Sequence, residues 1–112
     1  MEIVHKVAGL IDDKKGLDIR ALDVRGISPI TDYLILASAE TVKQTKALAD
    51  HVMKELKSEN SLICRHLDGY ENGEWIILDY FDFLVHLFTP QKRELYDLDH
   101  LYGGVNVISR HD

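Results

Sequence analysis

Two aspartates and a histidine lie close together in the segment WIILDYFDFLVHLF, which spans residues 75–88. Asp79 and Asp82 are separated by two aromatic residues, so both carboxylates would lie at one tight turn if a strand ends there and another begins. Two carboxylates that close could bind Mg²⁺. With His86 they would suit a magnesium-dependent nucleotidyltransferase or phosphohydrolase. Aspartates more commonly cap and solvate such turns, and we expect that simpler role.

The histidines and the single cysteine do not indicate a metal site. His86 alternates with Leu84 and Phe88, which places all three on one strand face, and a lone histidine there is usually structural. The other five histidines lack zinc-ligand spacing. Because Cys64 is the only cysteine, an internal disulfide and a four-cysteine zinc site are excluded. We expect a buried, unreactive thiol.

A second acidic pair, Asp97 and Asp99, has the Asp-x-Asp spacing of some nucleotidyltransferase metal sites. That chemistry needs a strand, where residues i and i+2 share a face. This segment predicts a helix, in which they do not face each other. The chain also holds no P-loop, no dinucleotide-binding glycine motif and no nucleophile elbow. The sequence therefore predicts a protein that is not an enzyme.

The bulk composition indicates one small globular domain. The chain has 112 residues, of which 46% are hydrophobic and 29% charged, enough for a single core. The net charge of -6 disfavours general nucleic-acid binding, which needs clustered Lys and Arg, and favours a basic protein partner. We find no membrane span and no export signal, and we expect a cytoplasmic protein.

Hydrophobic periodicity predicts the order α-β-β-α-β-β-β-α. We expect helices over residues 3–14, 41–59 and 89–102, the second with a Thr41–Gln44 capping box and the third packed through Leu95, Leu98, Leu101 and Tyr102. Strands are expected over 19–24, 32–39, 62–67, 75–78 and 83–89. The predicted fold class is α/β, with a mixed sheet of about five strands and helices packed on it. Residues 1–104 would form one domain, and residues 105–112 a flexible tail.

The aromatic residues favour a binding surface over a substrate pocket. Trp and Tyr near Arg commonly anchor protein interfaces, although each one taken singly is more often a core residue. The aromatic candidates are Tyr33, Trp75, Tyr80, Tyr96 and Tyr102. As a group, with acidic residues and Arg93 around them, they fit an interface with a polar rim.

Four segments, in order and in register, resemble the Iojap-like family of ribosomal silencing factors. They are GLDIRALDV at 16–24, ITDYLILAS at 30–38, QTKALADHV at 44–52, and WIILDYFDFLVHLF followed by RELYDLDHLY. The resemblance covers residues 3–102. It implies a fold similar to nucleotidyltransferases without their catalytic motif, and a non-enzymatic role without a cofactor.

The resemblance also implies a partner. The family binds the large ribosomal subunit through its protein numbered fourteen, blocks joining of the small subunit, and so lowers translation when nutrients are scarce. Little or no direct contact with nucleic acid is expected, and a homodimer could form through an uncovered sheet edge. By motif position the partner-binding residues are Asp32, Tyr33, Trp75, Asp79, Tyr80, Asp82, His86, Arg93 and Tyr96.

Three departures from the family pattern stand out. Phe81 occupies a position where the family usually has Gly, so the turn around it would use a different backbone geometry. Ala39 and Glu40 replace a more usual Gly-Thr, and Tyr102 replaces a frequent Trp. The first departure bears on the local shape of the expected binding surface.

Overall fold

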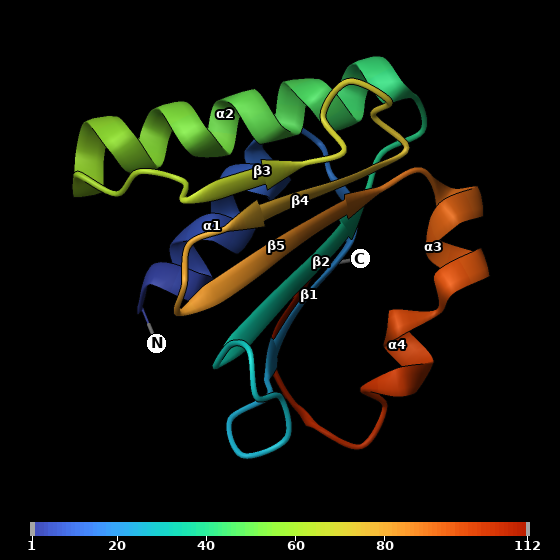
Figure 1. Cartoon of the computed structure of the whole chain (residues 1–112). Helices are drawn as coiled ribbons and strands as arrows, with labels where there is room; N and C mark the ends of the chain where they lie inside the picture. Colours follow the sequence, from blue (N-terminus) through green and yellow to red (C-terminus); the bar gives the residue numbers. More distant parts are fainter. Residues whose placement is uncertain (1, 112) are drawn as a thin grey trace.

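The computed structural model describes residues 2–111 as a six-stranded mixed sheet with helices on both faces (Figure 1). The elements are α1 (Glu2–Asp13), β1 (Leu17–Asp23), β2 (Tyr33–Ser38), α2 (Val42–Asn60), β3 (His66–Asp68), β4 (Trp75–Asp79), β5 (Phe83–Phe88), α3 (Pro90–Tyr96), α4 (Leu98–Leu101) and β6 (Asn106–His111). The strand order is β3-β4-β5-β2-β1-β6. Among the strands of the described residues, only β2 and β5 are parallel neighbours. The predicted α/β class with a mixed sheet is confirmed.

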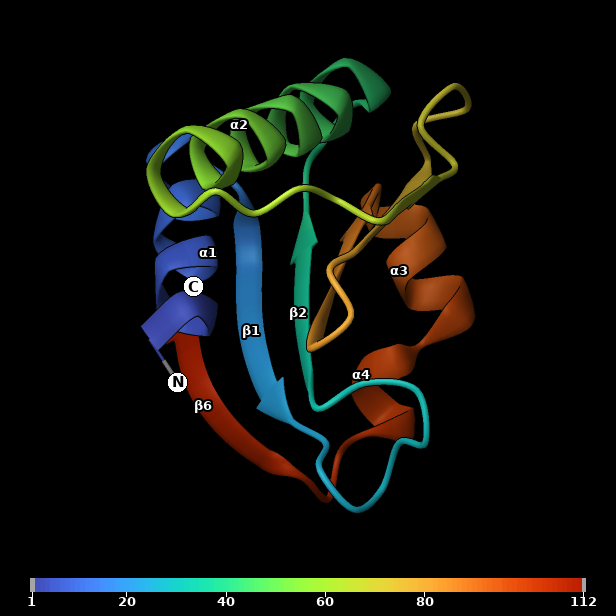
Figure 2. The same ribbon diagram turned by 60° about the vertical axis from the view of Figure 1, so that its left-hand side comes forward.

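Helices α1 and α2 cover one face of the sheet (Figures 1 and 2). Helix α2 begins with the predicted capping box, because the Thr41 hydroxyl accepts from the Gln44 N–H and the Gln44 side chain accepts from the Thr41 N–H. The two helices bury their apolar stripes against the strands. The core on this face includes Val4, Val7, Ile11, Leu48, Val52, Leu56, Ile35, Ile76, Val85 and Leu87. No helix within residues 2–111 has the length and apolarity needed to cross a membrane.

Strand β2 lies inside the sheet, between β5 and β1. All six of its residues are buried, as its unbroken apolar run predicts for a strand covered on both faces. On the second face, Leu34 and Leu36 pack with Leu22 and Phe88 in a smaller core. Helix α4 and the turn after it contribute to this second core.

The single helix expected after Thr89 is divided in two. Asp97 adopts a left-handed conformation with φ of +48° and ends α3, and its side chain accepts from the His100 N–H at the start of α4. The predicted packing face is wrong in part: Leu95 and Leu101 are exposed, whereas Leu98 packs on the second core. The break changes the direction of the chain before α4. The helical spacing of apolar residues therefore does not continue from α3 into α4.

Two strand predictions are wrong. Residues 106–111, expected to be a loose tail, form β6 and pair antiparallel with β1. Without β6, β1 would present an edge of unpaired N–H and C=O groups. Of the strand expected over residues 62–67, only His66 and Leu67 lie in β3. The Leu62 N–H instead donates to Leu56 O and completes the end of α2.

Candidate functional site

The face of the sheet opposite α1 and α2 is only partly covered. Side chains that pair across neighbouring strands point to the same face. On this face Trp75 pairs with Phe88, Ile77 with His86, Asp79 with Leu84, Asp68 with Ile77, and His66 with Asp79. Helices α3 and α4 lie against the other half, where they pack on residues of β5, β2 and β1. Helix α3 also reaches β4, where Tyr96 contacts the Trp75 ring, and within residues 2–111 no helix lies over the rest of the β3–β4 part of this face (Figure 1).

We call this uncovered half, formed by His66, Asp68, Ile77, Asp79 and Leu84, the open sheet face. His66 and Asp68 are exposed, and the other three side chains are half-buried. Ile77 and Leu84 therefore present apolar surface to solvent, with the polar side chains of Asp68 and Asp79 beside them. A half-exposed apolar patch with a polar rim is typical of a protein-binding surface.

An aromatic cluster borders the open sheet face on the side of α3. The Trp75 ring lies 4.4 Å from the Tyr96 ring and 5.2 Å from the Phe88 ring, between centroids. Its Nε1–H donates to Nδ1 of His86 at 3.0 Å. Trp75 is half-buried and Tyr96 is 50% exposed. Both rings can therefore contact a partner, and their orientation is already fixed in the free protein.

His86 is a buried structural residue that orients Trp75. Because Nδ1 accepts a hydrogen bond from the indole, the imidazole must be neutral, with its proton on Nε2. Burial lowers the pKa of His86 to about 4. The imidazole is 7% exposed, so it supports the aromatic cluster from below.

This burial predicts a loss of stability in acid. The unfolded chain protonates His86 near its ordinary pKa of 6.5, whereas the folded protein resists protonation down to a pKa of about 4. The unfolded state therefore binds more protons in that window, and stability falls as the pH is lowered through it. We expect the His86 contribution to cost about 2 kcal/mol between pH 7 and about pH 4.5.

Urea unfolding at the two pH values measures this loss. His86→Gln keeps an acceptor for the indole but does not titrate, so it should lose correspondingly less stability in acid than the wild type. His5→Gln, at an exposed histidine, should lose as much as the wild type. An equal acid loss in His86→Gln and the wild type would contradict the prediction.

The two aspartates suggested as metal ligands serve the turn between β4 and β5. The Asp79 carboxylate accepts from the Phe81 N–H at 2.8 Å. The backbone carbonyl of Asp82 accepts from the N–H groups of Asp32 and Tyr33, while its side chain is exposed. Among residues 2–111 no group of three or more His, Cys, Asp or Glu could hold a metal ion. The turn-capping role is thus seen for Asp79, whereas Asp82 is joined to the turn and to the loop before β2 through its backbone.

Phe81, within this turn, has a left-handed backbone with φ of +76°. For a residue other than Gly this conformation costs about 1 to 2 kcal/mol. The side chain is 61% exposed, and the Arg65 guanidinium lies over its ring at 4.9 Å. The expected change of turn geometry is therefore not observed, because Phe81 adopts the backbone conformation that Gly favours.

Besides His86, three of the predicted partner-binding residues are buried. Tyr33 and Tyr80 belong to the core under α1 and α2 and are 8% and 7% exposed. The Tyr80 ring stacks on Phe83, and burial strongly raises the pKa of its hydroxyl. Neither tyrosine reaches the open sheet face. Cys64 is half-buried, and burial raises the pKa of its thiol.

Arg93, the third, ties α3 to the sheet. It is 7% exposed. Its guanidinium donates twice to the Asp99 carboxylate at 3.0 Å, to the Asp18 carbonyl at 2.7 Å and to the Ser38 hydroxyl at 3.0 Å. Arg20 donates to the same carboxylate. Hydrogen bonds from Arg93 hold the pKa of Asp99 below its ordinary value despite burial.

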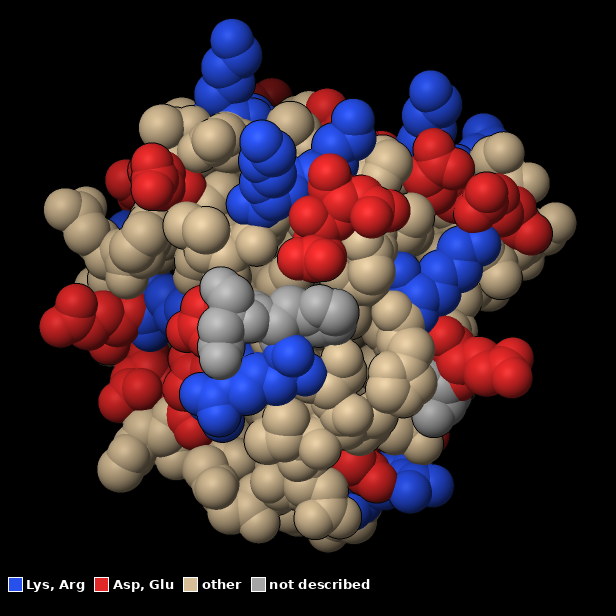
Figure 3. Space-filling view, turned by 180° about the vertical axis from the view of Figure 1, so that it is seen from behind, with Lys and Arg blue, Asp and Glu red and all other residues tan. Residues whose placement is uncertain are grey.

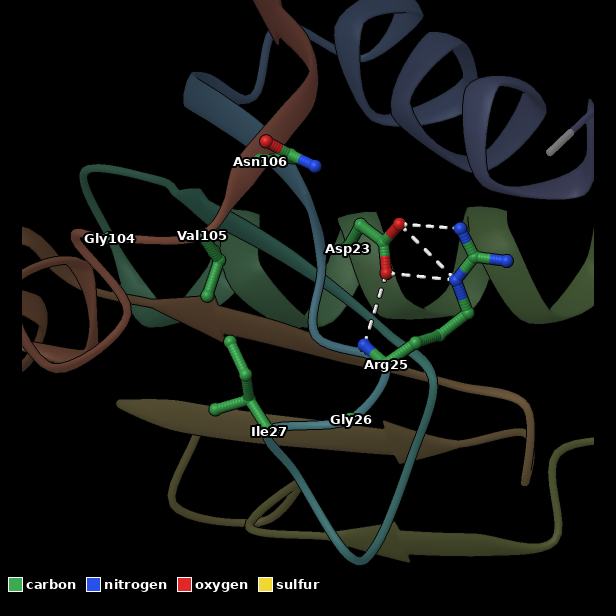
Figure 4. Close-up of a pocket in the computed structure, with 7 residues that line it drawn as sticks. All are labelled: Asp23, Arg25, Gly26, Ile27, Gly104, Val105 and Asn106. Atoms are coloured by element: carbon green, nitrogen blue, oxygen red, sulfur yellow. Dashed lines mark hydrogen bonds and ion pairs between the residues drawn. The ribbon is translucent and has the colours of Figure 1, made fainter.

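Two hollows lie away from the open sheet face. One, of about 540 Å³, adjoins the loop after β1, where Asp23 and Arg25 form a two-pronged ion pair and Ile27 faces Val105 (Figure 4). None of the predicted site residues lines it. The other, of about 490 Å³, lies over Arg93 and its acidic partners. Hydrogen-bond donors and acceptors largely satisfy one another in the Asp23–Arg25 pair and in the Arg93 network. Neither hollow therefore brings together free catalytic groups.

The structure thus gathers Trp75, Asp79 and Tyr96 on or beside the open sheet face, with His86 beneath it. Asp32 and Asp82 are exposed at one end of the sheet. Ile77 and Leu84 were not among the site residues predicted from the sequence. Ile77 alternates with Ile76 and Leu78, and Leu84 with Val85, so the pattern assigns Ile77 and Leu84 to the second strand face. It does not show which part of that face the helices leave uncovered.

Comparison with known proteins decides the family. The family model described as "Ribosomal silencing factor during starvation" matches residues 1–112. The chain belongs to the ribosomal silencing factor family. The Ribosomal silencing factor RsfS of Halalkalibacterium halodurans is 33% identical over 107 residues, covering 96% of this chain and 91% of the relative. The one from Chromobacterium violaceum is 36% identical over 103 residues, covering 92% and 84%.

Solved structures agree with this membership in the ribosomal silencing factor family. A crystal structure of a Chromobacterium violaceum protein has a TM-score of 0.85 at 34% identity and covers 93% of this chain and 87% of that one. A Bacillus halodurans structure has a TM-score of 0.80 at 28% identity and covers 97% and 99%. The chloroplastic protein Iojap of Zea mays is 32% identical over 94 residues, which cover 84% of this chain and 40% of the relative.

The negative charge of this ribosomal silencing factor family member is unevenly distributed. Residues 2–15 and 42–60, which form α1, α2 and the turn after α1, carry seven Lys and six Asp or Glu. Residues 16–41 and 61–111 carry six Lys or Arg and twelve Asp or Glu. Figure 3 shows the molecule from behind, with basic and acidic side chains interspersed on that side. The excess acid therefore lies on the part that includes the open sheet face.

Proposed function

We propose that this protein binds the large ribosomal subunit in the cytoplasm through the open sheet face and blocks joining of the small subunit. Translation then falls when nutrients are limited. Membership in the ribosomal silencing factor family carries the proposal. The half-exposed Ile77 and Leu84, beside preorganised Trp75 and Tyr96, supply a surface that could do it.

The partner we propose is the large-subunit protein numbered fourteen. Ribosomal proteins are commonly basic, and the acid excess lies outside α1 and α2. Complementary charge speeds association and fixes orientation more than it adds affinity. Apolar contact with Ile77 and Leu84 would supply most of the binding free energy, with Asp68 and Asp79 at the rim.

The proposed mechanism is steric and needs no reaction. The described residues extend 33 × 32 × 24 Å. A stable interface buries about 800 Å² on each partner, a modest share of the 6463 Å² that the protein exposes. Most of the body would therefore project from the large subunit and occupy space that the small subunit needs. The Asp79 carboxylate and neutral His86 both take part in structural hydrogen bonds.

A subunit-joining assay tests the proposal. Excess protein is added to separated subunits at low Mg²⁺, the Mg²⁺ concentration is raised, and the products are resolved on a sucrose gradient. We expect fewer full ribosomes and co-sedimentation of the protein with the large subunit alone. Unchanged joining at saturating protein would reject the proposal. Adding the protein to preformed ribosomes controls for dissociation, since a steric block acts only before the subunits meet.

A further inference from the structure

The turn between β4 and β5 exposes an aromatic ring on a strained backbone. Phe81 is 61% exposed although its φ of +76° favours Gly. Among the aromatic and cation–π contacts of the described residues, the Phe81 ring has one partner, the exposed Arg65 side chain. An exposed cation–π pair adds little stability. The fold therefore gains little in return for holding this ring outward.

A second exposed apolar residue lies beside this turn. Ile30, in the loop between β1 and β2, is 73% exposed. The loop is attached to the turn because the Thr31 hydroxyl donates to the Phe81 carbonyl at 3.3 Å and the Asp32 N–H donates to the Asp82 carbonyl at 3.2 Å. Both views place the loop and the turn at the same end of the sheet (Figures 1 and 2).

This end of the sheet continues the open sheet face. Asp79 belongs to that face, and its carboxylate accepts the Phe81 N–H at 2.8 Å, so the ring is anchored to the rim of the face. Asp32 and Asp82, whose backbones are joined by a hydrogen bond at this end, are both exposed. Asp32 and Asp82 at the tip thus add to Asp68 and Asp79 of the open sheet face, and one basic partner could cover both surfaces.

We propose that Phe81 and Ile30 form a second apolar anchor for the same ribosomal partner, wrapping the interface around the end of the sheet. This inference rests on the proposed function. The partner surface would carry an apolar depression for the Phe81 ring, bordered by Lys or Arg that meet Asp32 and Asp82. The Phe81 ring would then add to the affinity of this chain for the large subunit. Gly at the same position could not make that contribution.

Phe81→Gly separates binding from folding. Removing the ring should weaken binding to purified large subunits at least fivefold, measured by biolayer interferometry. It should also raise Tm, because Gly adopts this backbone conformation without strain. A merely structural role would move Tm alone. Ile30→Ser should weaken binding as well, and Phe81→Tyr, which keeps the ring, should bind within twofold of the wild type.

The control is Val42→Ser, at an apolar residue of α2 that is 40% exposed; it should bind as the wild type does. If Phe81→Gly binds as tightly as the wild type while Ile77→Lys does not bind, the second anchor is overturned and the proposed function stands. If the wild-type protein does not bind large subunits, the proposed function fails and this inference fails with it.

Discussion

Arg93→Met is expected to lower the free energy of unfolding by about 3 to 5 kcal/mol. Met keeps most of the side-chain volume but removes every donor. The Asp99 carboxylate then keeps only Arg20, and the Asp18 carbonyl and Ser38 hydroxyl lose the partner that the structure gives them at this site. Since Arg93 joins α3, α4, β1 and β2, its loss should also loosen α3 and expose the second core. Urea unfolding followed by Trp75 fluorescence measures both effects.

Two controls make this prediction specific. Arg25→Met removes an ion pair of similar geometry at an exposed site, and we expect it to cost far less than Arg93→Met because solvent screens the pair. Combining Arg93→Met with Asp99→Asn should cost less than the sum of the two single changes, because both remove the same Arg93–Asp99 ion pair. A loss in Arg93→Met no larger than in Arg25→Met would show that the buried network contributes little.

Arg93 also shows what sequence reasoning lacks. Its proximity to Tyr96 suggested a partner-binding pair, yet the two side chains take opposite roles: Tyr96 is half-exposed and Arg93 is enclosed. Nothing in the motif indicates that Asp18, 75 positions away, supplies a buried carbonyl acceptor. Long-range polar contacts of this kind depend on the packed sheet and leave no periodic signal in the chain.

Local signals predicted local structure well. The Thr41–Gln44 capping box, the start of α3 at Pro90 and the buried run of β2 were all recognisable because each depends on neighbouring residues. Predictions failed where a distant segment decides the outcome. Strand β6 forms only because β1 offers a free edge, and Asp97 ends α3 in a conformation that side-chain spacing does not reveal.

The candidate site was predictable to a similar extent. Trp75, Asp79 and Tyr96 were placed on or beside the surface they were expected to form. Tyr33 and Tyr80 do not lie on that surface. In a strand or at its end, a shift of one residue moves a side chain to the opposite face. Ile77 and Leu84 were missed because apolar residues in strands usually indicate core, and only the positions of α3 and α4 show that part of this face is uncovered.

Ile77→Lys is expected to weaken binding to the large subunit about 100-fold or more. In the free protein the change should be tolerated, since Asp68 is the cross-strand partner of residue 77 and a Lys–Asp pair is favourable there. In the complex the same lysine would place a charge at the centre of an apolar contact and against a basic partner. We expect the stability of the free protein to change by under about 1 kcal/mol.

Ile77→Glu distinguishes the loss of apolar shape complementarity from the electrostatic repulsion that a lysine adds towards a basic partner. It faces Asp68 with like charge and should destabilise the free protein more than Lys does. Towards a basic partner, however, its charge is attractive, so binding should fall less than with Lys. Lys54→Glu, on the exposed surface of α2, should bind as the wild type does. Equal binding losses for Lys and Glu at position 77 would argue against a basic partner, because shape complementarity alone would then decide affinity.

Wild-type binding by Ile77→Lys would remove the open sheet face from the interface, since no partner could bind on that face and tolerate a lysine at its apolar centre.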